Sequence, residues 1–201
     1  MPRLIIATGN AHKVQEIKDA LDQADLDFTV LSLKDLETVP EIIEDGTTFA
    51  ENAHKKTAAL AAAYPADYIL ADDSGLIIPA LNGEPGVYSA RYAGDHDDQA
   101  NNEKVLTKLA ALDGGDRSAH FMTVMELVGP GKEDLKVSGQ VDGVITTEPA
   151  GDNLFGYDPI FYYPEAGKTF AQMTVSEKNG LSHRGRALEK LLQALPEWLA
   201  K

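Results

Sequence analysis

Two adjacent carboxylates, Asp72 and Asp73, follow the apolar run Tyr68 to Ala71 and precede Ser74-Gly75. An apolar run of this length is typical of a buried strand. Carboxylates at the exit of a buried strand are costly unless a cation or a hydrogen-bond donor pairs with them. Successive strand side chains point to opposite faces, so we expect the two acids to do different jobs. The alternative is a plain turn, because Asp-Asp-Ser-Gly is also good turn chemistry.

A candidate phosphate site lies near the N-terminus, in the run Thr8-Gly9-Asn10-Ala11-His12-Lys13. This run follows a predicted strand over residues 4–7 and opens a predicted helix. Backbone N–H groups at a helix start favour phosphate, and Lys13 would add positive charge. Lys56, on a later predicted helix, is either a second phosphate contact or a solvated residue. The run has neither P-loop nor G-x-G-x-x-G spacing, so a capped helix with a surface lysine is the alternative.

Acidic residues surround the start of the alanine-rich segment Phe49–Ala63. Thr48 and Glu51 are three residues apart and fit a capping box, which predicts that a helix begins here. Acids at a helix start suit the helix dipole, which is the simple explanation of Glu44, Asp45 and Glu51. The sharper hypothesis makes one of them a magnesium ligand together with Asp73, since Mg²⁺ takes few carboxylates plus phosphate oxygens.

Two later stretches could contact a ligand. Phe155-Gly156-Tyr157-Asp158-Pro159 places an aromatic ring beside a glycine that lets backbone approach a ligand. Ser182-His183-Arg184-Gly185-Arg186 is a basic cluster at a predicted helix start, where the helix dipole does not favour cations. Each has a structural alternative: a core aromatic in the first stretch and tolerated surface cations in the second.

The elements that must position these residues follow from hydrophobic periodicity and capping signals. Strands are predicted over residues 4–7, 28–33, 68–71, 76–81, 117–128 and 135–145, and helices over residues 11–24, 49–63, 101–112 and from about Ser182 to Pro196. Strands alternate with helices early, and a long antiparallel hairpin follows late. We therefore expect an α/β protein with a mixed sheet, folded as a single domain over residues 1–201.

Composition bounds the function. The chain has 201 residues, 18 basic against 32 acidic, and a formal net charge of −14. This charge opposes binding to nucleic acid or to anionic membranes, although a local cluster of lysines could still hold a small anion. The absence of cysteine excludes disulfide and thiolate chemistry. No stretch is typical of a signal peptide or a membrane span, so we expect a cytoplasmic protein.

Taken together, the motifs resemble those of the inosine triphosphate pyrophosphatase family. The matching stretches, in family order, are Thr8-Gly9-Asn10 with Lys13, Phe49 to Ala53 with Lys56, Ala71 to Leu76, Pro85 to Tyr92, Gly151, Phe155 to Phe161, and Ser182 to Gly185. Each stretch alone is weak, but the ordered set covers nearly the whole chain. Thr57 departs from the alanine expected after Lys56, and the acidic loop before Gly46 varies in the family.

The resemblance implies an elongated α/β fold, with a mixed β-sheet, flanking helices and an active-site cleft between two lobes. It also implies a homodimer and Mg²⁺-dependent hydrolysis of purine nucleoside triphosphates (ITP, dITP, XTP and dXTP) to the monophosphate and pyrophosphate. Two alternatives stay open. One is a pyrophosphatase for other modified nucleotides, such as pyrimidines. The other is a nucleotide-binding protein without catalysis.

The same resemblance implies roles for individual residues. Asp73 would be the general base and a metal ligand, and Glu44 a possible second ligand. The run from Thr8 to Lys13, with Lys56, would hold the triphosphate. The remaining substrate-binding residues would be Ser74, Phe155, Gly156, Tyr157, Asp158, Lys178, His183 and Arg184.

Overall fold

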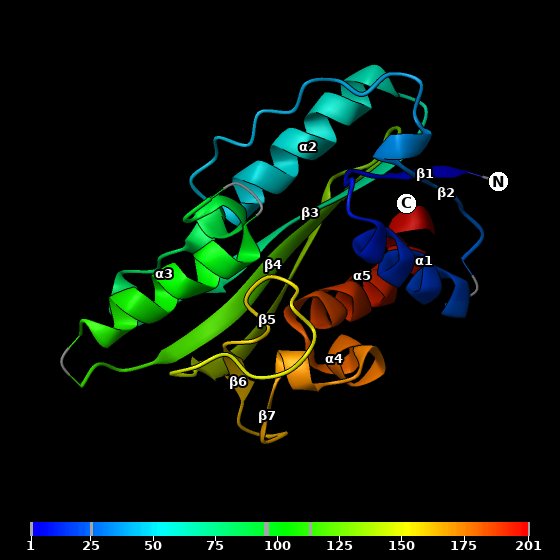
Figure 1. Ribbon diagram of the computed structural model, residues 1–201. Coiled ribbons are helices and arrows are strands. Elements are labelled where there is room, and N and C mark those ends of the chain that lie inside the picture. Colours follow the sequence, from blue (N-terminus) through cyan, green and yellow to red (C-terminus); the bar gives the residue numbers. More distant parts are fainter. Residues whose placement is uncertain (1, 25, 95–96, 113, 201) are drawn as a thin grey trace. The chain divides into compact units, whose positions relative to one another are not determined.

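The computed structural model describes residues 2–24, 26–94, 97–112 and 114–200, without the side chain of His12. The described strands are β1 (Arg3–Ile6), β2 (Thr29–Ser32), β3 (Tyr68–Ile77), β4 (Ser118–Val128), β5 (Leu135–Ile145), β6 (Phe161–Tyr163) and β7 (Lys168–Thr169). The α-helices are α1 (Ala11–Gln23), α2 (Phe49–Ala63), α3 (Asp98–Ala110), α4 (Val175–Leu181) and α5 (His183–Ala200) (Figure 1).

One mixed sheet contains the seven strands in the order β2-β1-β3-β4-β5-β6-β7. β1 runs parallel to both β2 and β3, whereas β6 runs antiparallel to both β5 and β7. β4 and β5 are neighbours in the sheet, as their alternating sequences predict. The predicted α/β class with a mixed sheet and flanking helices is therefore confirmed.

The chain divides into two compact units. Unit 1 contains Met1–Asp73, Thr123–Gly139 and Arg186–Lys201, and unit 2 contains Ser74–Met122 and Gln140–Gly185. The boundaries fall inside β3, β4, β5 and α5, so both units hold part of each of these elements. The expectation of a single domain, and that of a cleft between two lobes, stay predictions.

The core of unit 1 has a layer on each face of the sheet. Leu4, Ile6 and Leu70 pack with α1 and α5 on one face. Ile5 and the neighbouring strand residues pack with α2 on the other. This follows from the strand period of two, which sends successive side chains to opposite faces. The members on the α2 face are Ile5, Ala7, Ile69, Ala71 and Leu60 of α2. The alternation along β3 thus assigns Asp72 to the α1 face and Asp73 to the α2 face.

The core of unit 2 is built around three phenylalanine rings. Phe121 and Phe161 have ring centroids 4.6 Å apart, and Phe161 and Phe170 are 4.9 Å apart. Val105 and Leu109 of α3 pack into the same cluster, together with residues of β3 to β6. These rings fix the segment that carries the predicted Phe155-to-Asp158 loop.

Several predicted boundaries were wrong. The strand predicted over residues 76–81 does not form as a separate element, because Pro79 begins a short 3-10 helix, Pro79–Leu81. The helix predicted over residues 101–112 runs instead over Asp98–Ala110. β3 does not end at Ala71 but continues through Asp72 and Asp73 to Ile77. Because β4 continues beside it in the sheet, tertiary pairing overrides the local turn preference of Ser74-Gly75. The last helix does not end at Pro196 but runs to Ala200. Burial of Trp198 in the core of unit 1 offsets the hydrogen bond that proline removes.

Candidate active site

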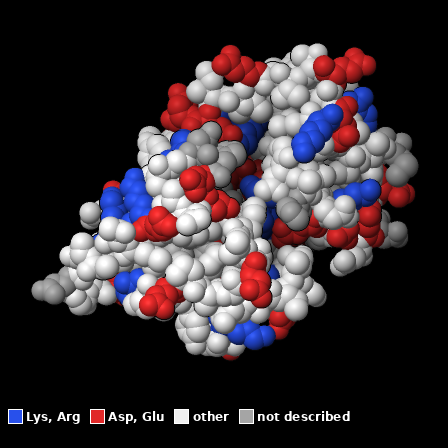
Figure 2. Space-filling model, in the orientation of Figure 1, with Lys and Arg blue, Asp and Glu red and all other residues white. Residues whose placement is uncertain are grey.

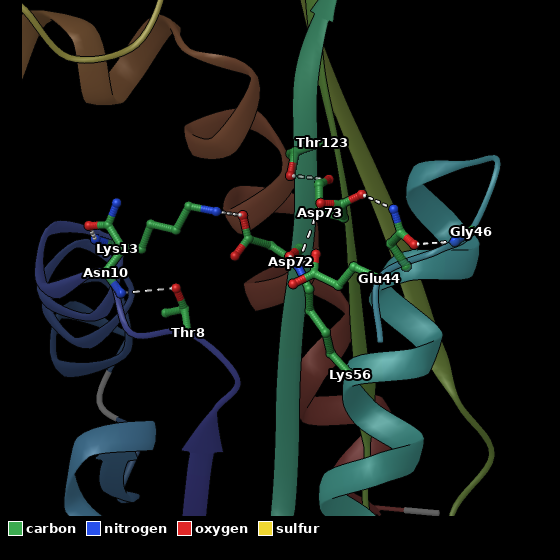
Figure 3. Close-up of polar contacts among 10 residues, drawn as sticks. Thr8, Asn10, Lys13, Glu44, Gly46, Lys56, Asp72, Asp73 and Thr123 are labelled. Atoms are coloured by element: carbon green, nitrogen blue, oxygen red, sulfur yellow. Dashed lines mark hydrogen bonds and ion pairs between the residues drawn. The ribbon is translucent and has the colours of Figure 1, made fainter. Parts of the chain in front are cut away.

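Asp72 pairs with the lysine of the predicted phosphate turn. Lys13 Nζ lies 2.6 Å from Asp72 Oδ2, and the Asp72 side chain is only 2% exposed. The start of α1 is organised by short polar contacts: Asn10 Oδ1 accepts from the Lys13 N–H at 3.3 Å, and Thr8 Oγ1 accepts from the Asn10 N–H at 3.2 Å. Figure 3 shows Lys13 extending from α1 to the carboxylate of Asp72. Asp72 thus has its partner on α1.

Asp73, the second carboxylate of the pair in β3, lies against α2 (Figure 3). Asn52 Nδ2 donates to Asp73 Oδ2 at 3.1 Å, and Lys56 Nζ lies 3.5 Å from Asp73 Oδ1. The Thr123 hydroxyl of β4 donates to the Asp73 backbone oxygen at 3.2 Å. Asn52 and Lys56 are four residues apart and so lie on one helix face. The side chain and the backbone of Asp73 are thus both held.

Glu44 completes this cluster. Lys56 Nζ lies 2.7 Å from Glu44 Oε2 and donates to the Asp72 backbone oxygen at 3.0 Å. The carboxylates of Glu44 and Asp73 therefore face one buried ammonium group. Carboxylate oxygens are the ligands that Mg²⁺ prefers, so the donor set of Glu44 and Asp73 fits this ion.

For both Asp73 and Lys56, burial and the attraction of opposite charges shift the pKa in opposite directions. Burial raises the pKa of the Asp73 carboxyl, and Lys56 and the Asn52 hydrogen bond only partly oppose that effect. Burial lowers the pKa of Lys56, but attraction by Asp73, Asp72 and Glu44 outweighs it and leaves this pKa raised. Lys56 therefore stays a cation, while Asp73 is a stronger base than an exposed aspartate.

Gly46 allows the acidic loop to approach α2 closely. Its N–H donates to Asn52 Oδ1 at 2.8 Å. A Cβ at this position would lie 2.6 Å from the same oxygen and 2.8 Å from Glu51 Cβ, so any side chain would force the loop away. Asn52 thus joins Asp73 to the loop that carries Glu44.

In unit 2, the first turns of α3 hold the loop that contains Phe155. Asp98 Oδ2 accepts from the Gly156 N–H at 2.8 Å, and Asn102 Nδ2 donates to the Gly156 oxygen at 2.9 Å. Gly156 has φ +55°, which favours glycine. Phe155 stays 40% exposed beside this clamped residue. The cap of α3 is Asp97, whose side chain accepts from the Ala100 N–H, which leaves the Asp98 side chain for the Phe155 loop.

Lys178 of α4 joins two of the predicted residues. Its ammonium group forms an ion pair with Asp158 and lies 5.3 Å from the centre of the Phe155 ring. Burial raises the pKa of Asp158, although Lys178 and Arg184 pull it back down. Unit 2 therefore brings an exposed aromatic ring, a lysine and a buried acid together.

The other predicted residues of unit 2 are more deeply packed. The His183 ring stacks on Phe121 with centroids 4.9 Å apart, and Arg184 is 9% exposed. Tyr157 is 5% exposed, and its hydroxyl donates to the Ser89 backbone oxygen at 2.7 Å. Burial raises the pKa of this hydroxyl. Ser74 is half-buried in β3. The substrate contacts of these residues stay predictions.

Sequence reasoning missed the residues that hold the site. Asn52 stood inside a quoted motif, and its spacing from Lys56 could have placed it on the same helix face. Asp98 and Asn102 are also four residues apart on one helix. Thr123 carried no local signal, because its contact with Asp73 spans 50 residues.

Charged side chains of both signs are interspersed over the face drawn in Figure 2, without a continuous basic stripe there. Among the described residues, none of the helices combines the length and the apolar character that crossing a membrane requires.

Comparison with known proteins gives a consistent answer. The model of the Ham1 family matches residues 4–194. A dITP/XTP pyrophosphatase of Leuconostoc mesenteroides is 58% identical, with 98% of both chains covered. One from Lactiplantibacillus plantarum is 48% identical, with 98% of this chain and 96% of that protein covered. The solved structure of a HAM1 protein from Coxiella burnetii matches with a TM-score of 0.91 and 42% identity, over 98% of this chain and all of that one. The chain belongs to the Ham1 family.

Proposed function

We propose that this protein hydrolyses noncanonical purine nucleoside triphosphates, such as dITP and XTP, to the monophosphate and pyrophosphate. The observation that carries the proposal is that Asp73 and Glu44 face the same ammonium group of Lys56. Phosphoryl chemistry depends on such placement of charge more than on covalent steps. The two relatives that are 58% and 48% identical are dITP/XTP pyrophosphatases, which supports the substrate class.

Asp73 is the general base in this proposal. Burial raises the pKa of Asp73 above that of an exposed aspartate, which makes its carboxylate a better proton acceptor. Asn52 and Thr123 fix its carboxylate and backbone. Asp73 can therefore orient a water molecule and accept its proton as the bond between the α- and β-phosphates breaks.

Asp73 and Glu44 would also hold Mg²⁺. When bound, this ion supplies positive charge that stabilises the departing pyrophosphate. Lys56 and Lys13 would contact phosphate oxygens, and the backbone N–H groups from Thr8 to Lys13 would bind the same group. Asp72 keeps the Lys13 ammonium in place for this task.

Residues of unit 2 would bind the base. Phe155 offers an exposed ring on which a purine can stack. His183 or Arg184 would donate to the oxygen at C6 of hypoxanthine or xanthine. Adenine carries an amino donor there, so a buried donor would face a second donor and adenine would be rejected. Ser74, Gly156, Tyr157, Asp158 and Lys178 would complete this part of the site.

Two further properties belong to the proposal. A homodimer follows from the resemblance of the motifs, and light scattering after size exclusion tests it by giving about twice the monomer mass. A cytoplasmic location fits a substrate drawn from the nucleotide pool.

Pyrophosphate release from a panel of nucleotides tests the function. We expect rapid, Mg²⁺-dependent release from dITP, ITP and XTP, and slow release from ATP and GTP. The Asp73→Asn variant should still bind dITP but hydrolyse it far more slowly than the wild type. Faster hydrolysis of a modified pyrimidine triphosphate would replace the proposed substrate. Binding of ITP without Mg²⁺-dependent turnover by the wild-type protein would replace catalysis with simple binding.

A further inference from the structure

A second polar cluster lies in unit 1, around Glu126 of β4. The side chain of Glu126 is fully buried, with 0% exposure. His54 Nδ1 lies 2.8 Å from its Oε1, and the Thr57 hydroxyl donates to the same oxygen at 3.2 Å. Its other oxygen, Oε2, is buried without a hydrogen-bond donor among the described residues. Lys136 Nζ lies 3.5 Å from Oε2, which is longer than a usual charge-assisted hydrogen bond.

Asp134 adds a second carboxylate. One ligand atom each from His54, Glu126 and Asp134 lies within 4.8 Å of the other two. The three residues come from α2, from β4 and from the turn before β5. His54 and Asp134 are exposed, whereas Glu126 is buried. The buried carboxylate of Glu126 in the sheet therefore fixes the cluster, and solvent reaches it through His54 and Asp134.

We propose that His54, Glu126 and Asp134 form a binding site for a first-row transition-metal dication, with Zn²⁺ as the probe. An imidazole nitrogen with two carboxylate oxygens is a donor set that Zn²⁺ takes. Mg²⁺ prefers oxygen ligands alone, so this site and the site of Asp73 and Glu44 favour different ions. Two carboxylates balance the charge of the ion once Lys136 moves aside. The buried Oε2 of Glu126, which accepts no hydrogen bond among the described residues, then gains a metal ligand bond in place of its contact with Lys136.

The proposed site is separate from the Asp73 cluster, although both use α2. Asn52 and Lys56 of this helix contact Asp73, whereas His54 and Thr57 contact Glu126. Variants of His54 therefore leave the Asp73 contacts in place. The metal-binding measurement can be made without reference to hydrolysis.

Equilibrium dialysis with Zn²⁺, in excess Mg²⁺ to occupy the magnesium ligands, tests the proposal. The full-length wild-type protein should bind about one equivalent of Zn²⁺. His54→Ala and Glu126→Gln should each weaken that binding at least tenfold. Zn²⁺ should also raise the Tm of the wild-type protein but not that of His54→Ala, because a ligand that binds only the folded state stabilises it.

Two control variants separate this site from others. His120→Ala removes an imidazole of unit 2, and Asp73→Asn removes the catalytic carboxylate; both should keep the Zn²⁺ affinity of the wild type. Equal affinity in the wild type, His54→Ala and Glu126→Gln would overturn the proposal and leave a buried ion-pair network. Loss of binding in Asp73→Asn would overturn it too, by assigning the ion to the other cluster. If Glu126→Gln does not fold, His54→Ala decides alone, since His54 is exposed.

Discussion

Asp72 and Asp73, adjacent in the sequence, send their carboxylates to opposite faces of β3. Asp72 pairs with Lys13 of α1 at 2.6 Å, and Asp73 accepts from Asn52 of α2 at 3.1 Å. The strand period of two enforces this separation. The two acids can therefore be changed one at a time, with different expected consequences for the reaction.

Asp73→Asn should lower kcat for dITP by about 10²–10⁴-fold, the usual contribution of a positioned base. The amide is isosteric with the carboxylate, so the fold should persist, as circular dichroism and the Tm would check. Steady-state pyrophosphate release measures the effect. A kcat near that of the wild type would remove Asp73 from the base role.

Asp72→Asn should act through Lys13 and therefore raise KM more than it lowers kcat. Residues in contact usually show coupling of about 0.5–3 kcal/mol in a double-mutant cycle. The cycle of Asp72→Asn with Lys13→Met, measured on kcat/KM, should show such coupling. Strictly additive effects would mean that Asp72 does not position the lysine for phosphate.

Asn52→Ala should shift the pH profile of kcat/KM. The Asn52 amide donates to the ionised form of Asp73 and so lowers a pKa that burial has raised. Removing this donor raises that pKa further, so activity should be lost at a higher pH on the acid side. Profiles of the wild type and Asn52→Ala, recorded at saturating Mg²⁺, measure the shift. A shift to lower pH would contradict the assigned base.

Asp98→Ala should loosen the loop that presents Phe155, if this ring stacks on the base. Asp98 holds the Gly156 N–H, and its loss should raise KM for dITP by about tenfold, or about 1.4 kcal/mol. Gln99→Ala is the matched control, because Gln99 lies in the same turn of α3 and its side chain donates to Glu103 at the exposed surface. An equal effect of both variants would indicate damage to the helix instead.

Gly46→Ala should weaken the response to Mg²⁺. The new Cβ would meet Asn52 Oδ1 at 2.6 Å, so the loop carrying Glu44 must move. The Mg²⁺ concentration for half-maximal rate should rise several-fold while KM at saturating Mg²⁺ changes less. Gly180→Ala is a suitable control, since nothing lies within 4 Å of its Cβ position. An unchanged Mg²⁺ response would mean that Glu44 is not a Mg²⁺ ligand.

Local signals in the sequence predicted the helices best. The capping box of Thr48 and Glu51 and the limits of α2 are confirmed, because caps and periodicity are properties of a few neighbouring residues. The course of β3 beyond Ala71 was missed, since pairing with a distant strand decides it. The contact of Asn52 with Asp73 spans 21 residues, and no short window of sequence encodes it.

The direction in which the side chains of α2 point limits where residues can be inserted into or deleted from this chain. Each residue of an α-helix turns the following ones by about 100°, because a turn has 3.6 residues. One residue inserted between Thr48 and Asn52, with the cap fixed, would turn the Asn52–Lys56 pair away from Asp73. Substitutions on the outer face of α2 should therefore be tolerated, whereas insertions and deletions of single residues in its first turn should not.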